Sequence, residues 1–131
     1  VTSGDPFLWS HEEHTRALYH DQAFADRALA APVSPELADI QIKNRFAFAR
    51  LAWQPRLFNP DLERWLHRIK VPVQIIWGND DKLLPAAYAQ AWIKQLPKAR
   101  LLPIANCGHL PHVERPDEVV NAVKSFSREA A

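Results

Sequence analysis

Two short polar segments of this 131-residue chain carry side chains suited to acid–base chemistry. The first, GNDDKLLP, contains Asp80 and Asp81, and the second, NCGH, ends at His109. A carboxylate that accepts the Nδ1 proton of an imidazole fixes its tautomer and leaves Nε2 free as a general base. The segments therefore predict a carboxylate–imidazole pair, provided that the fold brings them together.

Each polar segment follows a short apolar run that has the character of a strand. These runs are Val73–Trp77 and Leu101–Ile104, and Pro103, which cannot donate to a ladder, favours an edge position for the second. A helix predicted over Pro85–Leu96 separates them, which indicates parallel pairing with a helical crossover. Because parallel strands end at the same edge of a sheet, the two polar segments are expected to meet there.

The rest of the chain shows helical patterns. Further helices are predicted over His11–Leu29, Glu36–Leu51, Asp61–Arg68 and Asp117–Phe126. We therefore expect an α/β chain in two parts. Residues 1–68 form a helical segment, and residues 69–131 form a strand–helix–strand–helix segment that carries the acid and histidine loops.

Composition excludes several classes of function. Apolar residues make up 47% of the chain, enough for a core, and the formal net charge is +1. This balance leaves no basic surface for nucleic acid or an anionic membrane, and no apolar stretch approaches the roughly 20 residues that span a bilayer. A single cysteine rules out an internal disulfide framework, so we expect a reducing, cytoplasmic location.

The order of the two polar segments resembles the C-terminal part of an α/β-hydrolase-fold enzyme. That family shows an apolar strand, G-x-x-D-x-x-x-P, a helix, a short strand, and G-H before a last helix. The first motif is matched by Gly78, Asp81 and Pro85, and the second by Gly108 and His109, with Glu114 and Pro116 behind. The resemblance covers about half of the chain and implies a partial α/β-hydrolase fold in which residues 1–68 are a cap.

The resemblance also implies roles for individual residues. Asp81 would be the acid of a catalytic triad and His109 its base, whereas Asp80 would occupy a variable position. Leu84 and Leu110 follow the two catalytic positions, and each would either line an apolar pocket or pack in the core. On spacing alone, Asp81 has a second interpretation as the cap of the helix that follows it.

The family's nucleophile elbow, G-x-S-x-G, does not occur in this sequence. We therefore expect a C-terminal fragment, inactive alone, of a serine-type hydrolase of small apolar esters, lactones or carbon–carbon bonds. No cofactor is expected. Two alternatives stay open: an epoxide hydrolase or dehalogenase relative with an Asp nucleophile, and a non-catalytic binding or assembly module derived from a hydrolase.

Three other features have competing interpretations. HEEH, residues 11–14, has residue types that bind metals, but its histidines are three positions apart instead of the four that zincins require, so no metal site is expected. Cys107 and His112 are interpreted as a packing residue and as a structural or pocket-rim residue. An open edge of the first strand predicts self-association of the fragment.

Overall fold

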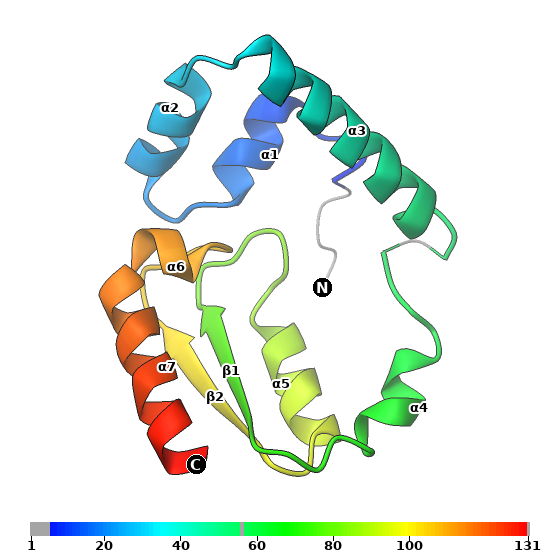
Figure 1. The fold of residues 1–131 in the computed structure, drawn as a ribbon, viewed down its shortest axis with the longest axis vertical. Helices are drawn as coiled ribbons and strands as arrows, with labels where there is room; N and C mark the ends of the chain where they lie inside the picture. The colour runs from blue at the N-terminus through cyan, green and yellow to red at the C-terminus, as the bar shows by residue number, and fades with distance from the viewer. Residues whose placement is uncertain (1–5, 56, 131) are drawn as a thin grey trace.

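A computed structural model describes residues 6–55 and 57–130 of the chain (Figure 1). The elements follow in the order α1 (His11–Ala17), α2 (Gln22–Ala30), α3 (Pro35–Ala52), α4 (Leu62–Leu66), β1 (Val73–Gly78), α5 (Ala87–Gln95), β2 (Ala99–Ile104), α6 (Pro111–Glu114) and α7 (Pro116–Ala130). Helices α1 to α3 lie beyond the carboxyl ends of the strands, and the chain then returns through α4 to the start of β1 (Figure 1).

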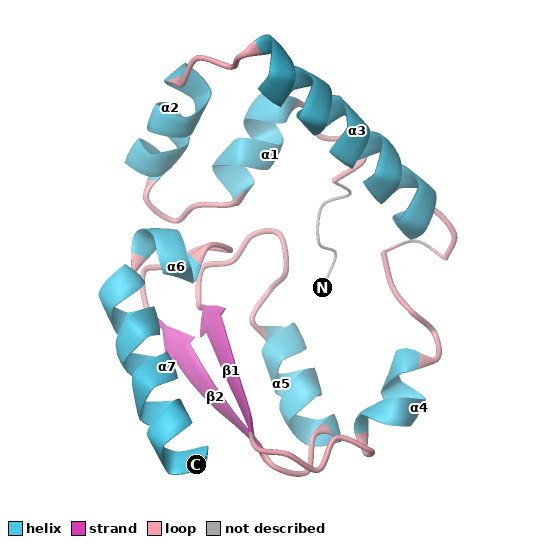
Figure 2. Cartoon of the chain, in the orientation of Figure 1, coloured by secondary structure: helices cyan, strands magenta, loops and turns pink. Residues whose placement is uncertain are grey.

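The two strands form a parallel pair, as the sequence predicts. Their register runs from Val73 opposite Ala99 to Gly78 opposite Ile104, and α5 makes the crossover between them. Figure 2 shows the strands side by side, with α5 and α7 flanking them. β2 begins two residues earlier than expected. Both strands end at the same edge, beside the loops that carry the acids and the histidine.

The core is small, and its two largest fully buried side chains lie close to that edge. Ile104, the last residue of β2, and Cys107 are the largest fully buried side chains among the described residues. Ala89 and Leu96, at α5 and its C-cap, are also buried. The packing interpretation of Cys107 agrees with this burial. The carboxyl end of β2 and the loop after it are therefore well packed.

The predicted single helix over His11–Leu29 is wrong, because the chain there forms α1 and α2 with a break between them. We call this break, Leu18–Asp21, the connector. Asp21 caps α2 by accepting a hydrogen bond from the backbone N–H of Ala23. Three backbone groups of the connector, the carbonyl of Leu18 and the N–H groups of His20 and Asp21, bond to the histidine loop and α6, so long-range contacts replace helical ones there.

The other helices differ from prediction mainly at their ends. α3 begins at Pro35 after the Ser34 cap, whereas α4 and α5 are shorter than expected. α7 begins at Pro116 and continues to Ala130, past the predicted end. The short helix α6 was not predicted, because one turn between Pro111 and Pro116 leaves no periodic pattern to detect.

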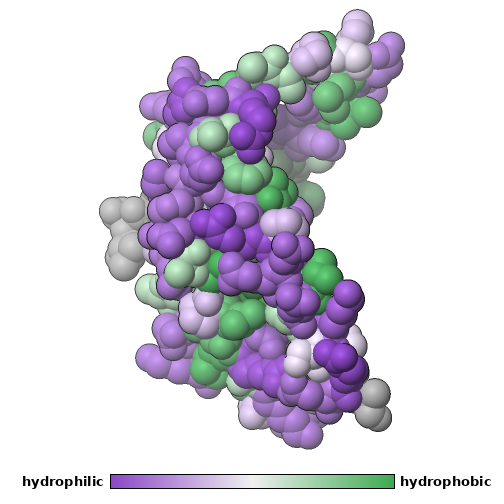
Figure 3. All heavy atoms as spheres, turned by 90° about the vertical axis from the view of Figure 1, so that its left-hand side faces the viewer, coloured by the Kyte–Doolittle hydropathy of each residue, from purple (hydrophilic) through white to green (hydrophobic). Residues whose placement is uncertain are grey.

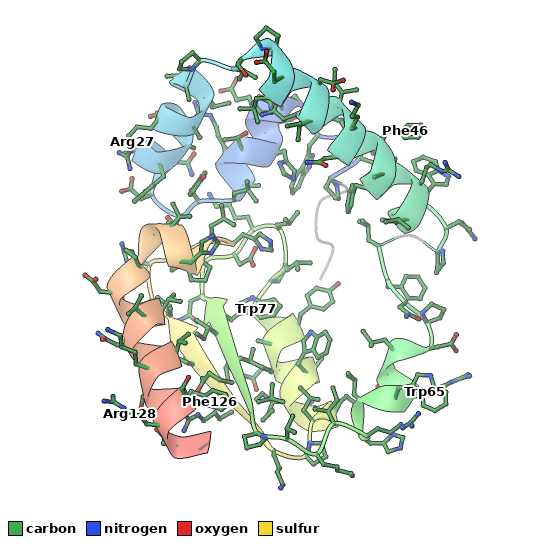
Figure 4. All side chains as sticks on the ribbon, viewed as in Figure 1. Arg27, Phe46, Trp65, Trp77, Phe126 and Arg128 are labelled. Carbon is green, nitrogen blue, oxygen red and sulfur yellow. The ribbon has the colours of Figure 1, made fainter. Side chains whose placement is uncertain are left out.

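The helical part exposes many apolar side chains. α3 contains no buried residue, and Phe46 on α3 and Trp65 on α4 point away from the rest of the chain (Figure 4). The face formed by the left-hand side of Figure 1 is mostly hydrophilic, with hydrophobic atoms in separate patches (Figure 3). Within the described residues, no helix is both long and apolar enough to cross a bilayer.

Candidate active site

The acid loop after β1 and the histidine loop after β2 meet, as predicted. Oδ2 of Asp81 lies 2.8 Å from Nδ1 of His109. The side chain of Asp81 is only 4% exposed, whereas that of His109 is 29% exposed and borders a cavity. The acid is therefore shielded from water while the imidazole retains access to a ligand.

Backbone donors orient the Asp81 carboxylate. Its Oδ1 accepts hydrogen bonds from the N–H groups of Leu83, at 2.9 Å, and Leu84, at 2.8 Å. These bonds occupy one oxygen and turn the other toward His109. Because an ionised carboxylate can only accept, Nδ1 of His109 carries the shared proton and Nε2 is left as the acceptor of a neutral ring. This is the tautomer that a general base needs.

The alternative role of Asp81 as a helix cap is wrong. The N-cap of α5 is Ala86, and no side chain caps that helix. Asp81 instead accepts the hydrogen bonds of Leu83 and Leu84 in the turn that precedes α5.

The backbones of the two loops are in direct contact. The N–H of Asn79 donates to the carbonyl of Ile104, and the N–H of Asp80 donates to the carbonyl of Cys107, both at 2.9 Å. A Cβ on Gly78 would lie 2.1 Å from the carbonyl oxygen of Gly108, closer than real Cβ contacts. The glycine of the G-x-x-D motif therefore allows this approach by having no side chain.

A second histidine–carboxylate pair lies beside the first. Nδ1 of His20, from the connector, is 3.0 Å from Oδ2 of Asp80, and both side chains are partly exposed. Consecutive carboxylates thus bind different histidines: Asp81 pairs with His109, and Asp80 pairs with the helical part. Sequence reasoning missed His20, because no local pattern links it to a loop sixty residues away.

A buried carboxylate lies behind the histidine loop. Glu114, at the end of α6, is 4% exposed and accepts hydrogen bonds from backbone N–H groups of Gly108 and the connector. In the sequence it follows the G-H motif by five positions and belongs to the resemblance with the hydrolase family, but no role was predicted for it. Local sequence gives no sign that this residue is buried beside the histidine loop.

A cavity of about 330 Å³ opens beside the histidine. It is lined by Ile76, Trp77, Gly78, Asp81, Leu84, His109, Pro111 and His112. This volume lies at the lower end of the range for small-molecule sites, roughly 300–1,000 Å³. The lining is mainly apolar near the strand ends, and Trp77, seen between β1 and α5 in Figure 4, donates its indole N–H to the carbonyl of Leu84 at 3.0 Å.

Of the two leucines predicted to line a pocket or pack in the core, only one lines the cavity. Leu84 lines the cavity and is 39% exposed. Leu110 is half-buried and is not among the lining residues; Pro111 and His112 take that place beside His109. His112 is thus found at the cavity, one of the two positions considered for it.

Two neighbouring groups have shifted pKa values. Burial lowers the pKa of His14 on α1, and electrostatic repulsion from Arg45, followed by smaller effects of His11 and His109, lowers it further. Burial raises the pKa of the Cys107 thiol to about 11, with the Glu114 charge adding to the shift. Because the thiolate is the reactive form, Cys107 is a poor nucleophile near neutral pH.

The described residues contain no group of three or more His, Cys, Asp or Glu side chains arranged to hold a metal ion. HEEH lies on α1, where Ser10 and Glu13 form a capping box. Glu13 therefore has a structural partner at the helix start.

Comparison with known proteins gives concordant matches. The profile of the alpha/beta hydrolase family matches residues 2–122. A monoacylglycerol lipase of Mus musculus is 30% identical over 94 residues, which cover 69% of this chain and 27% of that protein. A pimeloyl-[acyl-carrier protein] methyl ester esterase of Nitrosomonas europaea is 39% identical over 62 residues, or 47% of this chain and 24% of the esterase.

A solved structure extends the match to nearly the whole chain. A mutant of a meta-cleavage product hydrolase superposes with a TM-score of 0.69 at 20% identity, covering 94% of this chain and 48% of that one. At this identity the likeness concerns the fold. The chain spans about a quarter of the two curated relatives and about half of the solved structure.

Proposed function

This chain belongs to the alpha/beta hydrolase family, and from that premise we propose that Asp81 and His109 are the acid and base of a catalytic triad in an ester hydrolase. The contact of 2.8 Å between Oδ2 of Asp81 and Nδ1 of His109 carries the proposal. The proposed substrates are small apolar esters, and lactones or compounds with a hydrolysable carbon–carbon bond are further candidates. The names of the lipase and esterase relatives favour esters.

The proposed reaction proceeds in two half-reactions. Nε2 of His109 takes the proton of a serine hydroxyl as its oxygen attacks the ester carbonyl, and then gives that proton to the departing alcohol. Water attacks the acyl-enzyme in the same way, releasing the acid and restoring the serine. Asp81 stays ionised throughout, keeping the ring in its tautomer and stabilising the imidazolium.

The nucleophile in this proposal comes from a part of the parent protein outside these 131 residues. The sequence has no G-x-S-x-G elbow, and it spans about a quarter of its curated relatives. The isolated chain is accordingly proposed to be inactive. Its helical segment, residues 1–68, is proposed as the cap, since α1 to α3 lie beyond the strand ends where the cavity opens (Figure 1).

Two further properties are proposed for the protein. The single cysteine is buried, which suits a reducing, cytoplasmic location. Among the described residues β1 pairs only with β2, so one edge of β1 is open to a second copy of the isolated chain. Light scattering of the purified chain tests this self-association, and a monomer at high concentration contradicts it.

The function is tested by comparing the 131-residue chain with a longer parent protein that contains it. Hydrolysis of short-chain p-nitrophenyl esters should occur only with the parent. His109→Gln should lower kcat by about 10⁴-fold or more. His67→Gln, an exposed histidine after α4, is the matched control and should retain full activity.

Two outcomes contradict the proposal. A parent that hydrolyses esters normally with His109→Gln excludes His109 from the reaction. A parent with no hydrolytic activity on esters, lactones or diketones favours the non-catalytic binding module instead.

A further inference from the structure

Glu114 is a buried carboxylate held by backbone groups from two distant segments. Its Oε1 accepts from the N–H groups of His20 and Asp21, each at 2.9 Å, which lie 94 and 93 positions earlier in the chain. Its Oε2 accepts from the N–H of Gly108 at 2.6 Å. Burying a carboxylate is costly unless such bonds replace its hydration, so this arrangement requires the connector and the histidine loop to stay together.

The connector also contacts the histidine loop directly. The backbone N–H of His109 donates to the carbonyl of Leu18 at 2.8 Å. A Cβ on Gly108 would lie 2.6 Å from that carbonyl oxygen and 2.8 Å from the nitrogen of His20. The connector therefore packs flat against Gly108 and His109, which only a glycine at position 108 permits.

A third contact joins the connector to the acid loop. His20 pairs through its side chain with Asp80, the residue before Asp81. Because both side chains are partly exposed, water screens this pair, and the bonds to the buried Glu114 carboxylate carry more of the attachment. The connector thus contacts both loops that present the Asp81–His109 pair.

We infer that Glu114 is a positioning residue: by clamping the connector to Gly108, it holds the backbone of His109 so that Nδ1 stays on Asp81. The catalytic consequence rests on the proposed function, whereas the geometric claim does not. A reacting group displaced by about 1 Å loses on the order of 10²-fold in rate. Loss of the clamp should therefore lower kcat of the parent by about 10²-fold, with KM little changed.

Glu114→Gln is the informative variant because it keeps the shape and removes one acceptor. Either orientation of the amide directs its NH₂ group at a backbone N–H, so one of the two segments loses its partner. Glu118→Gln is the matched control, since Glu118 is 57% exposed on α7 and its contact with Arg115 is only a 4.0 Å ion pair.

The first readout is the Nδ1 proton of His109, observed by NMR in the 131-residue chain. The wild type and Glu118→Gln should show this proton protected from exchange with water. In Glu114→Gln its exchange should be faster by about tenfold or more, because a donor left unpaired beside the buried side chain of residue 114 opens the local structure. Equal protection in all three proteins overturns the inference, even if Glu114→Gln lowers the melting temperature.

The second readout needs no variant and decides the question if Glu114→Gln does not fold. Native-state hydrogen exchange in the wild type should show the amides of His20, Asp21, Gly108 and His109 opening together, with one common free energy. Fast exchange at His20 and Asp21 beside a protected Gly108 refutes the clamp.

The inference and the proposed function fail in different ways. If His109→Gln leaves the parent active but these protection patterns appear, the clamp stands and the catalytic role falls. If His109 proves essential while Glu114→Gln keeps both kcat and the protected proton, the clamp falls and the catalytic role stands.

Discussion

Replacing Asp81 with asparagine is expected to invert the tautomer of His109 while leaving its loop in place. The N–H groups of Leu83 and Leu84 both donate to Oδ1 and require an acceptor there. The amide oxygen of the new side chain must therefore take that position, which turns its NH₂ group toward Nδ1 of His109. A donor facing Nδ1 forces the proton onto Nε2, and the ring then lacks the free nitrogen that a base needs.

The size of the effect follows from this tautomer switch. In Ser-His-Asp triads the wrong tautomer lowers kcat by about 10⁴-fold, equivalent to about 5.5 kcal/mol of activation free energy. The free energy of unfolding should fall by far less, about 1–2 kcal/mol, because a neutral hydrogen bond replaces a charge-assisted one in an otherwise intact loop. A large kinetic loss with a small stability loss is the expected combination.

Two assays check this expectation. Long-range ¹H–¹⁵N NMR spectra of the chain report which nitrogen of His109 carries the proton, and ester hydrolysis by the parent reports kcat. Asp80→Asn is the control, since it makes the same chemical change at the next residue but on the carboxylate that pairs with His20. The reasoning is refuted if Asp81→Asn leaves the proton on Nδ1, or if Asp80→Asn causes the larger loss of activity.

Three further predictions concern the surroundings of the pair. With a pKa of about 11, Cys107 is about 10⁻³ thiolate at pH 8, so iodoacetamide should not modify the native chain; rapid alkylation seen by mass spectrometry contradicts this. The pKa of His14 is lowered in the folded state, so the unfolded chain binds more protons and the free energy of unfolding should fall as the pH drops through the ordinary histidine range. Urea unfolding at about pH 5.5 and pH 7.5 should show this fall in the wild type and a smaller fall in His14→Gln. Gly78→Ala should lower the free energy of unfolding by about 1–3 kcal/mol, because its Cβ would meet the carbonyl oxygens of Gly108 at 2.1 Å and of Cys107 at 2.4 Å; an unchanged melting temperature would mean that the loops are not this close.

The resemblance to the alpha/beta hydrolase family, the fold class and the meeting of the two loops were accessible from sequence. The family profile and the parallel pairing of β1 with β2 confirm the first two. Strand character is local, since VQIIW is a β-branched apolar run ended by a glycine. The crossover rule then places both strand ends at one edge, so the meeting of the two loops follows from topology. The choice of Asp81 over Asp80 came from the resemblance to the family, because topology does not distinguish the two neighbouring acids.

The break between α1 and α2 was not accessible in the same way. Residues across His11–Leu29 favour a helix, and Asp21 is the one local sign of a new helix start. What keeps the connector out of a helix is its bonding to Glu114 and His109, more than eighty residues away. Such contacts are properties of the assembled fold and leave no periodic trace in the sequence.

The two buried carboxylates beside the histidine loop share one arrangement. In Asp81, two consecutive backbone N–H groups hold Oδ1 and direct Oδ2 to the side chain of His109. In Glu114, two consecutive N–H groups hold Oε1 and direct Oε2 to the backbone of Gly108. One carboxylate thus orients the ring and the other holds the chain that carries it. Because each has one oxygen committed to a pair of amides, neither can rotate away without leaving those donors unpaired, so the ring of His109 and the backbone just before it are each held in place.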